Sequence, residues 1–215
     1  MTGTTVEPTR FAGRDILFVM AAELEYGRHL RERFIPLMTG VGPVEAAISL
    51  TANLTALAAA DKLPSTIVSL GSAGSRVLDQ GEVYQVIDVS YRDMDASALG
   101  LEKGVTPFLD KPARLVLPYV IPGLPRASLS SGGNVVSGFG YDGILAQMVD
   151  METYSVVRVA DRFGIPVIGL RGIFDGHAEL TEMNHWSASL EDLDRKLAEA
   201  VDMMAAAVEG EALPL

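Results

Sequence analysis

The sequence predicts a three-layer α/β/α fold, with helices on both faces of a mixed, mostly parallel central sheet. Continuous apolar runs, typical of strands buried on both faces, alternate along the chain with helical patterns. Of its 215 residues, 48% are hydrophobic and 21% charged, so a sizeable core can be buried. We therefore expect a single α/β domain over residues 14–215, preceded by a flexible N-terminus over residues 1–13.

The first part of the chain alternates apolar runs with helical patterns twice. Residues 15–21 (DILFVMA) are the first expected strand, and a helical pattern follows them. A second strand is expected over residues 34–38. Residues 39–43 (TGVGP) then turn into a long helix over residues 44–61, because helices tolerate proline at their first position. The glycines of this turn either bring backbone amides to a bound group or only make a tight turn.

The middle and the end of the chain continue this pattern. Residues 67–70 are an expected strand that leads into the small residues 71–75 (GSAGS), an expected loop that resembles a phosphate or ribose cradle. This segment matches neither the G-x-G-x-x-G fingerprint nor a P-loop, so it gives little support to a dinucleotide or ATP site. Further strands are expected within residues 81–90 and 127–131, and a last helix begins at Ser189.

We expect the fold to be arranged around residues 144–176. A short apolar strand ends at Glu152, an amphipathic helix follows, and Gly164 stops this helix before the apolar strand at 165–173. In a right-handed crossover the carboxyl ends of two such strands lie on the same sheet edge, where open α/β sheets bind ligands. Glu152 and Asp175 should therefore face one cleft.

Three carboxylates follow predicted strands: Glu25, Glu152 and Asp175. Crowded carboxylates raise one another's proton affinity, so such a site can hold a protonated acid and an ionised base together. That chemistry suits glycosidic cleavage, in which one acid protonates the leaving group and another activates water. Acids also stabilise the first turn of a helix, so Glu25 is either a helix-terminus residue or a site residue on this pattern alone.

Composition excludes several classes of partner and site. The net charge of −11 argues against nucleic acid or an anionic membrane surface. The absence of cysteine excludes disulfides and thiolate metal sites and fits a reducing cytoplasm. His177 and His185 lack a third ligand, so we expect no metal. We find no signal peptide and no apolar run of the ~20 residues that a membrane helix needs, and expect a soluble cytoplasmic protein.

Six segments of the chain together form a recognisable set of motifs: MAAELE at 20–25, TGVGP at 39–43, SLGSAG at 69–74, RDMDASALG at 92–100, VDMET at 149–153 and IPVIGLRGIFDG at 165–176. In this order they resemble the nucleoside phosphorylase/nucleosidase superfamily, and within it most closely the 5′-methylthioadenosine/S-adenosylhomocysteine nucleosidases. The resemblance runs from about Asp15 to the C-terminal helix and is strongest in the paired Met-Glu and the later Arg-x-x-x-Asp.

The resemblance implies the catalytic roles. Glu25 matches the glutamate that holds and activates the attacking water. Asp175 matches the aspartate that protonates N7 of adenine while the C1′–N9 bond breaks. Ser72 and Arg171 match residues that help to place the water and the glutamates. This reaction needs no cofactor and no metal.

The resemblance also implies how the nucleoside is bound. Glu152 matches the residue that binds the ribose hydroxyls, and Met151 packs against the sugar. The negative charge of Glu152 should favour an oxocarbenium-like transition state. Val41 would line the pocket for the 5′-substituent, and Gly74 borders the base site.

The base should stack on an aromatic residue near Tyr141, with Phe139 as the alternative. Two departures from the family pattern concern this region. Phe174 replaces the small hydroxyl residue that usually precedes the catalytic aspartate, and the loop at 138–143 looks shortened. We expect a narrower or altered substrate range.

Three other functions stay open from the sequence. A phosphorylase would need cationic and amide donors for phosphate, whereas Glu23 and Glu25 would repel it. A futalosine-type hydrolase would act on a different 5′-substituent. A nucleoside-binding homologue without activity would keep the fold only. Family members usually form dimers, and residues 101–109, with Val105 and Phe108, are either the dimer contact or a solvated surface loop.

Overall fold

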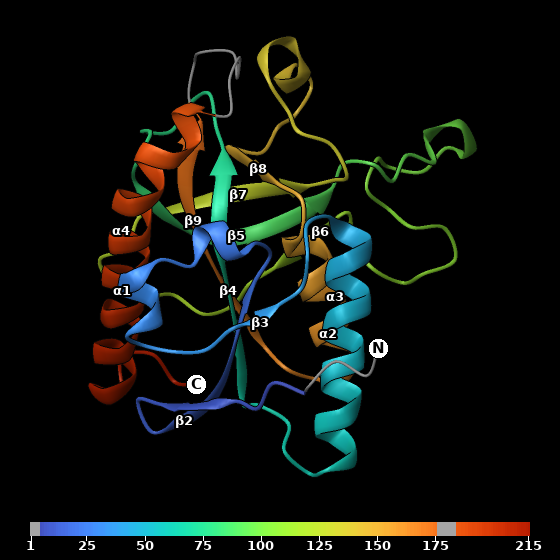
Figure 1. The fold of residues 1–215 in the computed structure, drawn as a ribbon. Helices are drawn as coiled ribbons and strands as arrows, with labels where there is room; N and C mark the ends of the chain where they lie inside the picture. Colours follow the sequence, from blue (N-terminus) through green and yellow to red (C-terminus); the bar gives the residue numbers. More distant parts are fainter. Residues whose placement is uncertain (1–4, 176–183) are drawn as a thin grey trace.

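The computed structural model describes residues 5–175 and 184–215, and only the backbone of residues 184–189. His177 and the side chain of His185 lie outside this described part. Figure 1 shows a sheet with helices along two sides.

The described strands are β1 Thr9–Phe11, β2 Arg14–Met20, β3 Leu37–Met38, β4 Thr66–Gly74, β5 Val83–Tyr91, β6 Arg114–Val116, β7 Arg126–Ser131, β8 Met148–Asp150 and β9 Val167–Asp175. The helices are α1 Arg28–Arg31, α2 Pro43–Ala59, α3 Thr153–Phe163 and α4 Asn184–Glu209, with short 3-10 helices η1 Glu23–Glu25, η2 Ser97–Leu99 and η3 Gly138–Tyr141.

The sheet is mixed and mostly parallel, as the sequence predicts. At its centre β4 runs parallel to β2 and to β9. On the far side of β9, β5 is antiparallel to β9 and parallel to β7, and β7 is parallel to β8. A single pair, Gly74 with Val149, joins β8 back to β4. The strand ends of β4, β8 and β9 are thereby brought close together.

Two hydrophobic clusters on opposite faces of the sheet account for the three layers. Neighbouring residues of β2 contribute to different clusters: Phe18 packs with α4, and Val19 packs with α2 and α3. Successive side chains of a strand point to opposite faces, so an unbroken apolar run indicates cover on both sides. Figure 1 shows α4 on one side of the sheet and α2 with α3 on the other.

Helix α4 contacts two other elements closely. A Cβ on Gly172 of β9 would lie 1.9 Å from Cδ1 of Leu193, so α4 packs directly on the backbone of that strand. The buried carboxylate of Asp194, also on α4, accepts hydrogen bonds from the backbone N–H groups of Gly27, His29 and Leu30 at 2.8–3.1 Å. It thereby satisfies donors at the start of α1 that have no partner within that helix.

Several element boundaries differ from the prediction. The segment 71–75 is not a loop for most of its length, because β4 continues to Gly74 and pairs with β9. Residues 9–11, within the expected flexible N-terminus, pair with β2 as β1. Helix α4 begins before Ser189. None of the helices in the described part of the chain combines the length and the apolar composition that a bilayer crossing requires.

Candidate active site

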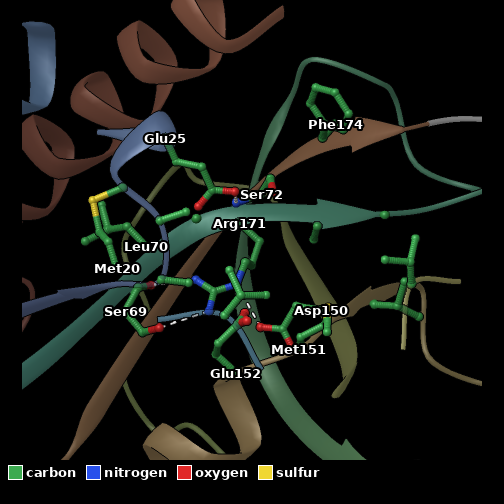
Figure 2. A pocket seen from close by; sticks show the side chains of 18 of the residues that line it. Met20, Glu25, Ser69, Leu70, Ser72, Asp150, Met151, Glu152, Arg171 and Phe174 are labelled. Carbon is green, nitrogen blue, oxygen red and sulfur yellow. Dashed lines mark hydrogen bonds and ion pairs between the residues drawn. The ribbon is translucent and has the colours of Figure 1, made fainter. Parts of the chain in front are cut away.

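A cavity of about 630 Å³ lies at the carboxyl ends of the central strands. The ends of β2, β4, β8 and β9 contribute to its lining, as do η1, the turn before α2 and the segment after β7. Of the site residues that the sequence predicts, eight line it: Glu25, Val41, Ser72, Gly74, Met151, Glu152, Arg171 and Asp175. Figure 2 shows Glu25 beside Ser72, and Arg171 between Ser69 and Asp150.

Glu25 is held against strand β4. The side chain is 8% exposed, and its Oε1 accepts hydrogen bonds from the backbone N–H and the hydroxyl of Ser72 at 3.2 and 2.5 Å. A Cβ on Gly71 would lie 2.9 Å from Oε2 of the same carboxylate. The small residues that the sequence shows here therefore make room for a carboxylate from the protein itself.

Glu152 occupies the N-cap position of α3, and its Oε1 accepts a 2.7 Å hydrogen bond from the backbone N–H of Gly42. Gly42 has φ = 99°, a conformation that favours glycine. The glycine turn before α2 thus brings its amide to Glu152. Burial raises the pKa of Glu152 to about 7, and the negative charge of Asp150 adds to the rise, while the Gly42 amide and Arg171 oppose it.

Asp175 ends β9 and is 9% exposed. Burial raises its pKa above the ordinary range for an aspartate, and nearby backbone amides and Tyr141 partly oppose this rise. A Cβ on Gly74 would lie 2.5 Å from Oδ1 of Asp175 and equally close to the hydroxyl oxygen of Tyr141. Both oxygens are buried, and neither makes a hydrogen bond of normal geometry to another described residue.

Arg171 is held on all sides by acceptors of the protein itself. Its side chain is 3% exposed and makes five hydrogen bonds, which match the five N–H groups of a guanidinium. All five acceptors belong to the protein, so Arg171 lines the cavity without a donor left for a substrate. The bonds run from Nε to Asp150 Oδ2 (3.0 Å), from Nη1 to the carbonyl oxygens of Ser69 (3.0 Å) and Leu170 (2.9 Å), and from Nη2 to the hydroxyls of Ser69 (2.9 Å) and Thr153 (2.6 Å).

Asp150 is a site residue that the sequence reasoning missed. Besides Arg171, its carboxylate binds the hydroxyl of Ser131 at 2.5 Å and both the backbone N–H and the hydroxyl of Thr153. It therefore fixes the end of β8 and the start of α3, on either side of Glu152. An aspartate shortly before a helix start is a capping signal, and this signal could have identified it.

A second arginine, Arg92, holds the wall of the cavity that follows β7. Its guanidinium also makes five hydrogen bonds to protein acceptors, four of them backbone carbonyl oxygens. The acceptors are the carbonyl oxygens of Ser130, Gly132, Asn134 and Asp150 and the side-chain oxygen of Asn134. Both arginines that line the cavity thus donate all their guanidinium N–H groups to acceptors of the protein.

The aromatic residues expected to stack on a base do not line the cavity. Phe139 is 89% exposed, and Tyr141 is buried, with its hydroxyl oxygen and Oδ1 of Asp175 both beside Gly74. Among the described lining residues the aromatic one is Phe174, and Val135 and Val136 add apolar surface. In the part of the chain that the structure describes, no cluster of His, Asp and Glu is arranged to hold a metal ion.

Comparison with known proteins gives consistent similarities. The family model described as the phosphorylase superfamily matches residues 134–210. A 5′-methylthioadenosine/S-adenosylhomocysteine nucleosidase of Staphylococcus aureus (strain JH9) is 28% identical over 174 residues, which cover 71% of this chain and 74% of that protein.

Solved structures share the fold. The native futalosine hydrolase of Helicobacter pylori strain 26695 matches with a TM-score of 0.72 at 21% identity, over 89% of this chain and 97% of that chain. A 5′-methylthioadenosine/S-adenosylhomocysteine nucleosidase from Campylobacter jejuni matches with a TM-score of 0.71 at 15% identity, over 92% and 100% of the two chains. The chain is thus similar to the phosphorylase superfamily in its segment 134–210, and to nucleosidases of known structure in its fold.

Proposed function

We propose that the chain is an N-glycosyl hydrolase that releases adenine from 5′-methylthioadenosine and S-adenosylhomocysteine, a reaction of methionine salvage. The observation that carries the proposal is the meeting of Glu25, Glu152 and Asp175 in one cavity of nucleoside size. The similarity to nucleosidases of this specificity supports the choice of substrate.

The environments of the three carboxylates support different roles. Burial favours the protonated form of Asp175, which suits a general acid that protonates N7 of adenine as the glycosidic bond breaks. Both donors of Ser72 bind Oε1 of Glu25, so the other oxygen can accept a hydrogen bond from the attacking water. Ionised Glu152 would bind the ribose hydroxyls and favour the positive charge that develops on the sugar.

The lack of free N–H donors on Arg92 and Arg171 supports hydrolysis over phosphorolysis. A phosphate nucleophile needs cationic or amide donors, whereas Arg92 and Arg171 donate every N–H group to protein acceptors. Glu25 would in addition repel phosphate at the position proposed for the water. Water carries no charge and meets neither obstacle.

Apolar residues would contact the rest of the nucleoside. Phe174 and the valines at 135 and 136 offer the apolar surface against which a purine could pack. Met151 would contact the sugar, and Val41, which is 56% exposed, would meet the 5′-substituent at the mouth.

We predict adenine release that does not depend on phosphate. Purified protein incubated with methylthioadenosine should yield free adenine and methylthioribose at the same rate with and without phosphate. A requirement for phosphate, with a sugar phosphate as product, would contradict the proposal.

Parallel assays with adenosylhomocysteine and futalosine define the preferred 5′-substituent, and faster turnover of futalosine would favour the futalosine-type alternative. Nucleoside binding without base release would indicate a non-enzymatic homologue.

We predict that Glu25→Gln and Asp175→Asn each lower kcat by about 10²–10⁴-fold, because each removes one general acid or base. Neither change removes core volume, so circular dichroism and the melting temperature should stay near those of the unchanged protein. Glu23→Gln is the matched control, since Glu23 precedes Glu25 by two residues and is exposed in an ion pair with Arg31. A near-normal rate in either test variant would show that its role is misassigned.

We predict that Glu152→Gln stabilises the protein at alkaline pH. The glutamine can keep the contact with Gly42. The folded pKa of Glu152 is about 7, against 4.5 as the ordinary value, so the unfolded chain loses this proton first as pH rises. The carboxyl therefore costs stability progressively between these two values, and the cost is complete above pH 7.

Urea unfolding should then show a gain of roughly 1–3 kcal/mol for Glu152→Gln at pH 8 and a much smaller gain at pH 5. Glu102→Gln, at an exposed position, should give the same small effect at both values. Equal gains of Glu152→Gln at both pH values would rule out this electrostatic origin.

We also propose a cytoplasmic homodimer. The absence of cysteine fits a reducing compartment, and finding the native protein in an oxidising one by cell fractionation would contradict this. Phe108, in the segment 101–109, is fully exposed, and Val44 and Ile48 of α2 are 64% and 59% exposed. Such exposed apolar surface is typical of an interface.

We predict that sedimentation equilibrium at micromolar concentration gives twice the chain mass. Phe108→Ser should weaken this association if segment 101–109 forms the contact, and Val44→Ser should weaken it if α2 does. A monomer at the assay concentration would remove the dimer proposal.

A further inference from the structure

Tyr141 is fixed beside the proposed acid, outside the cavity. It lies in η3, is 6% exposed, and packs with Val136 and Val149 in a small cluster of its own. The guanidinium of Arg76 lies 5.7 Å from the centre of its ring. Since Tyr141 is not among the lining residues, its ring does not face the space that a substrate would occupy.

The Tyr141 hydroxyl and the Asp175 carboxyl converge on Gly74. Each places an oxygen 2.5 Å from the position that a Cβ of residue 74 would occupy, so a side chain larger than hydrogen would collide with both. These two oxygens are buried without a hydrogen bond of normal geometry to another described residue. Buried polar atoms of this kind are costly unless they find a partner, and here the hydroxyl and the carboxyl interact with each other.

We propose that Tyr141 is a positioning residue whose hydroxyl orients the Asp175 carboxyl and donates a hydrogen bond to it when it is ionised. The inference rests on the proposed function, because the acid that Tyr141 would serve is the proton donor of that reaction. Tyr141 would thus act on the proposed proton donor Asp175, whereas the sequence led us to expect that it stacks on the base.

The proton balance of the step is simple. Asp175 gives its proton to N7 of the base and becomes a carboxylate, while the electron pair of the C1′–N9 bond moves to the base. The sugar is left as an oxocarbenium ion, the attacking water forms a new C1′–O bond, and Glu25 accepts the proton that this water loses. The Tyr141 hydroxyl donates to the new charge on Asp175 and keeps its own proton, because burial and the neighbouring Asp175 raise the pKa of the phenol. The hydrogen bond strengthens as charge develops, which is where it lowers the barrier.

Few other described groups near Asp175 could donate this hydrogen bond to its carboxyl. The residue before Asp175 is Phe174, whose side chain carries no hydroxyl. The charged groups that act on the phenol besides Asp175 are the guanidinium groups of Arg76 and Arg92, and backbone amides of Ser75 and Asp175 act on the carboxyl. Arg92 donates all its N–H groups to other acceptors, so among the side chains that the structure describes around Asp175 the Tyr141 hydroxyl is the donor available to the carboxyl.

The test is Tyr141→Phe, which removes the hydroxyl and keeps the ring in its cluster. Loss of one hydrogen bond to a charged group should lower kcat about 10–100-fold, with KM changed less than twofold because Tyr141 does not line the cavity. The hydroxyl favours ionised Asp175, so its loss raises the pKa of that carboxyl. Since the acid must be protonated to act, the high-pH limb of the kcat/KM profile should move to higher pH.

Tyr84→Phe is the matched control. It removes a hydroxyl that accepts a 3.4 Å hydrogen bond from Asp79, in a side chain outside the cavity lining, and should leave kcat and the pH profile unchanged. Carbon-13 NMR titration of labelled aspartates, with Asp175→Asn to assign the signal, follows the same pKa without turnover. An unchanged Asp175 titration in Tyr141→Phe would overturn the inference. Absence of base release by the unchanged protein would instead overturn the proposed function.

Discussion

The buried ion pair between Arg171 and Asp150 is the interaction on which the geometry of the cavity depends. Removing two charges from water is expensive, and their attraction repays the cost only when the remaining donors and acceptors are satisfied. That condition is met here, because the guanidinium has five protein acceptors and the carboxylate has donors from Ser131 and Thr153. The pair joins β9 to β8 and to the start of α3, and thereby fixes the strand that ends in Asp175 relative to the turn that carries Glu152.

The same pair sets the electrostatics of the cavity. Because Arg171 is engaged by Asp150, it only partly offsets the cost of ionising Glu152, whose pKa lies near neutrality. Glu25 is instead bound by two donors of Ser72. Carboxylates in one cavity are thus kept in different environments, which is how a single site can provide both an acid and a base.

The sequence pattern predicted that Glu152 and Asp175 face one cleft, because both follow apolar runs and the crossover rule places such strand ends on one edge. Glu25 was assigned to the same site by the family resemblance, since on the pattern alone it could also be a helix-terminus residue. The sequence also predicted the layers, since the unbroken apolar runs require cover on both faces. It could not reveal that Arg171 has no free donor, because its acceptors come from four separate elements. Nor could it show that residues 71–74 extend a strand, since small residues are compatible with a loop as well. The orientation of Tyr141 likewise depends on packing that no local pattern encodes.

Helix α4 is attached to the elements that carry both proposed proton-transfer groups. Leu193 packs over the bare backbone of β9 at Gly172, and the next residue, Asp194, binds the first amides of α1, directly after the short helix that contains Glu25. Proteins open locally in cooperative segments. Detachment of α4 would therefore loosen both the segment that carries Glu25 and the strand that ends in Asp175, so that the loss of one helix from one face of the sheet would disturb two sides of the cavity at once.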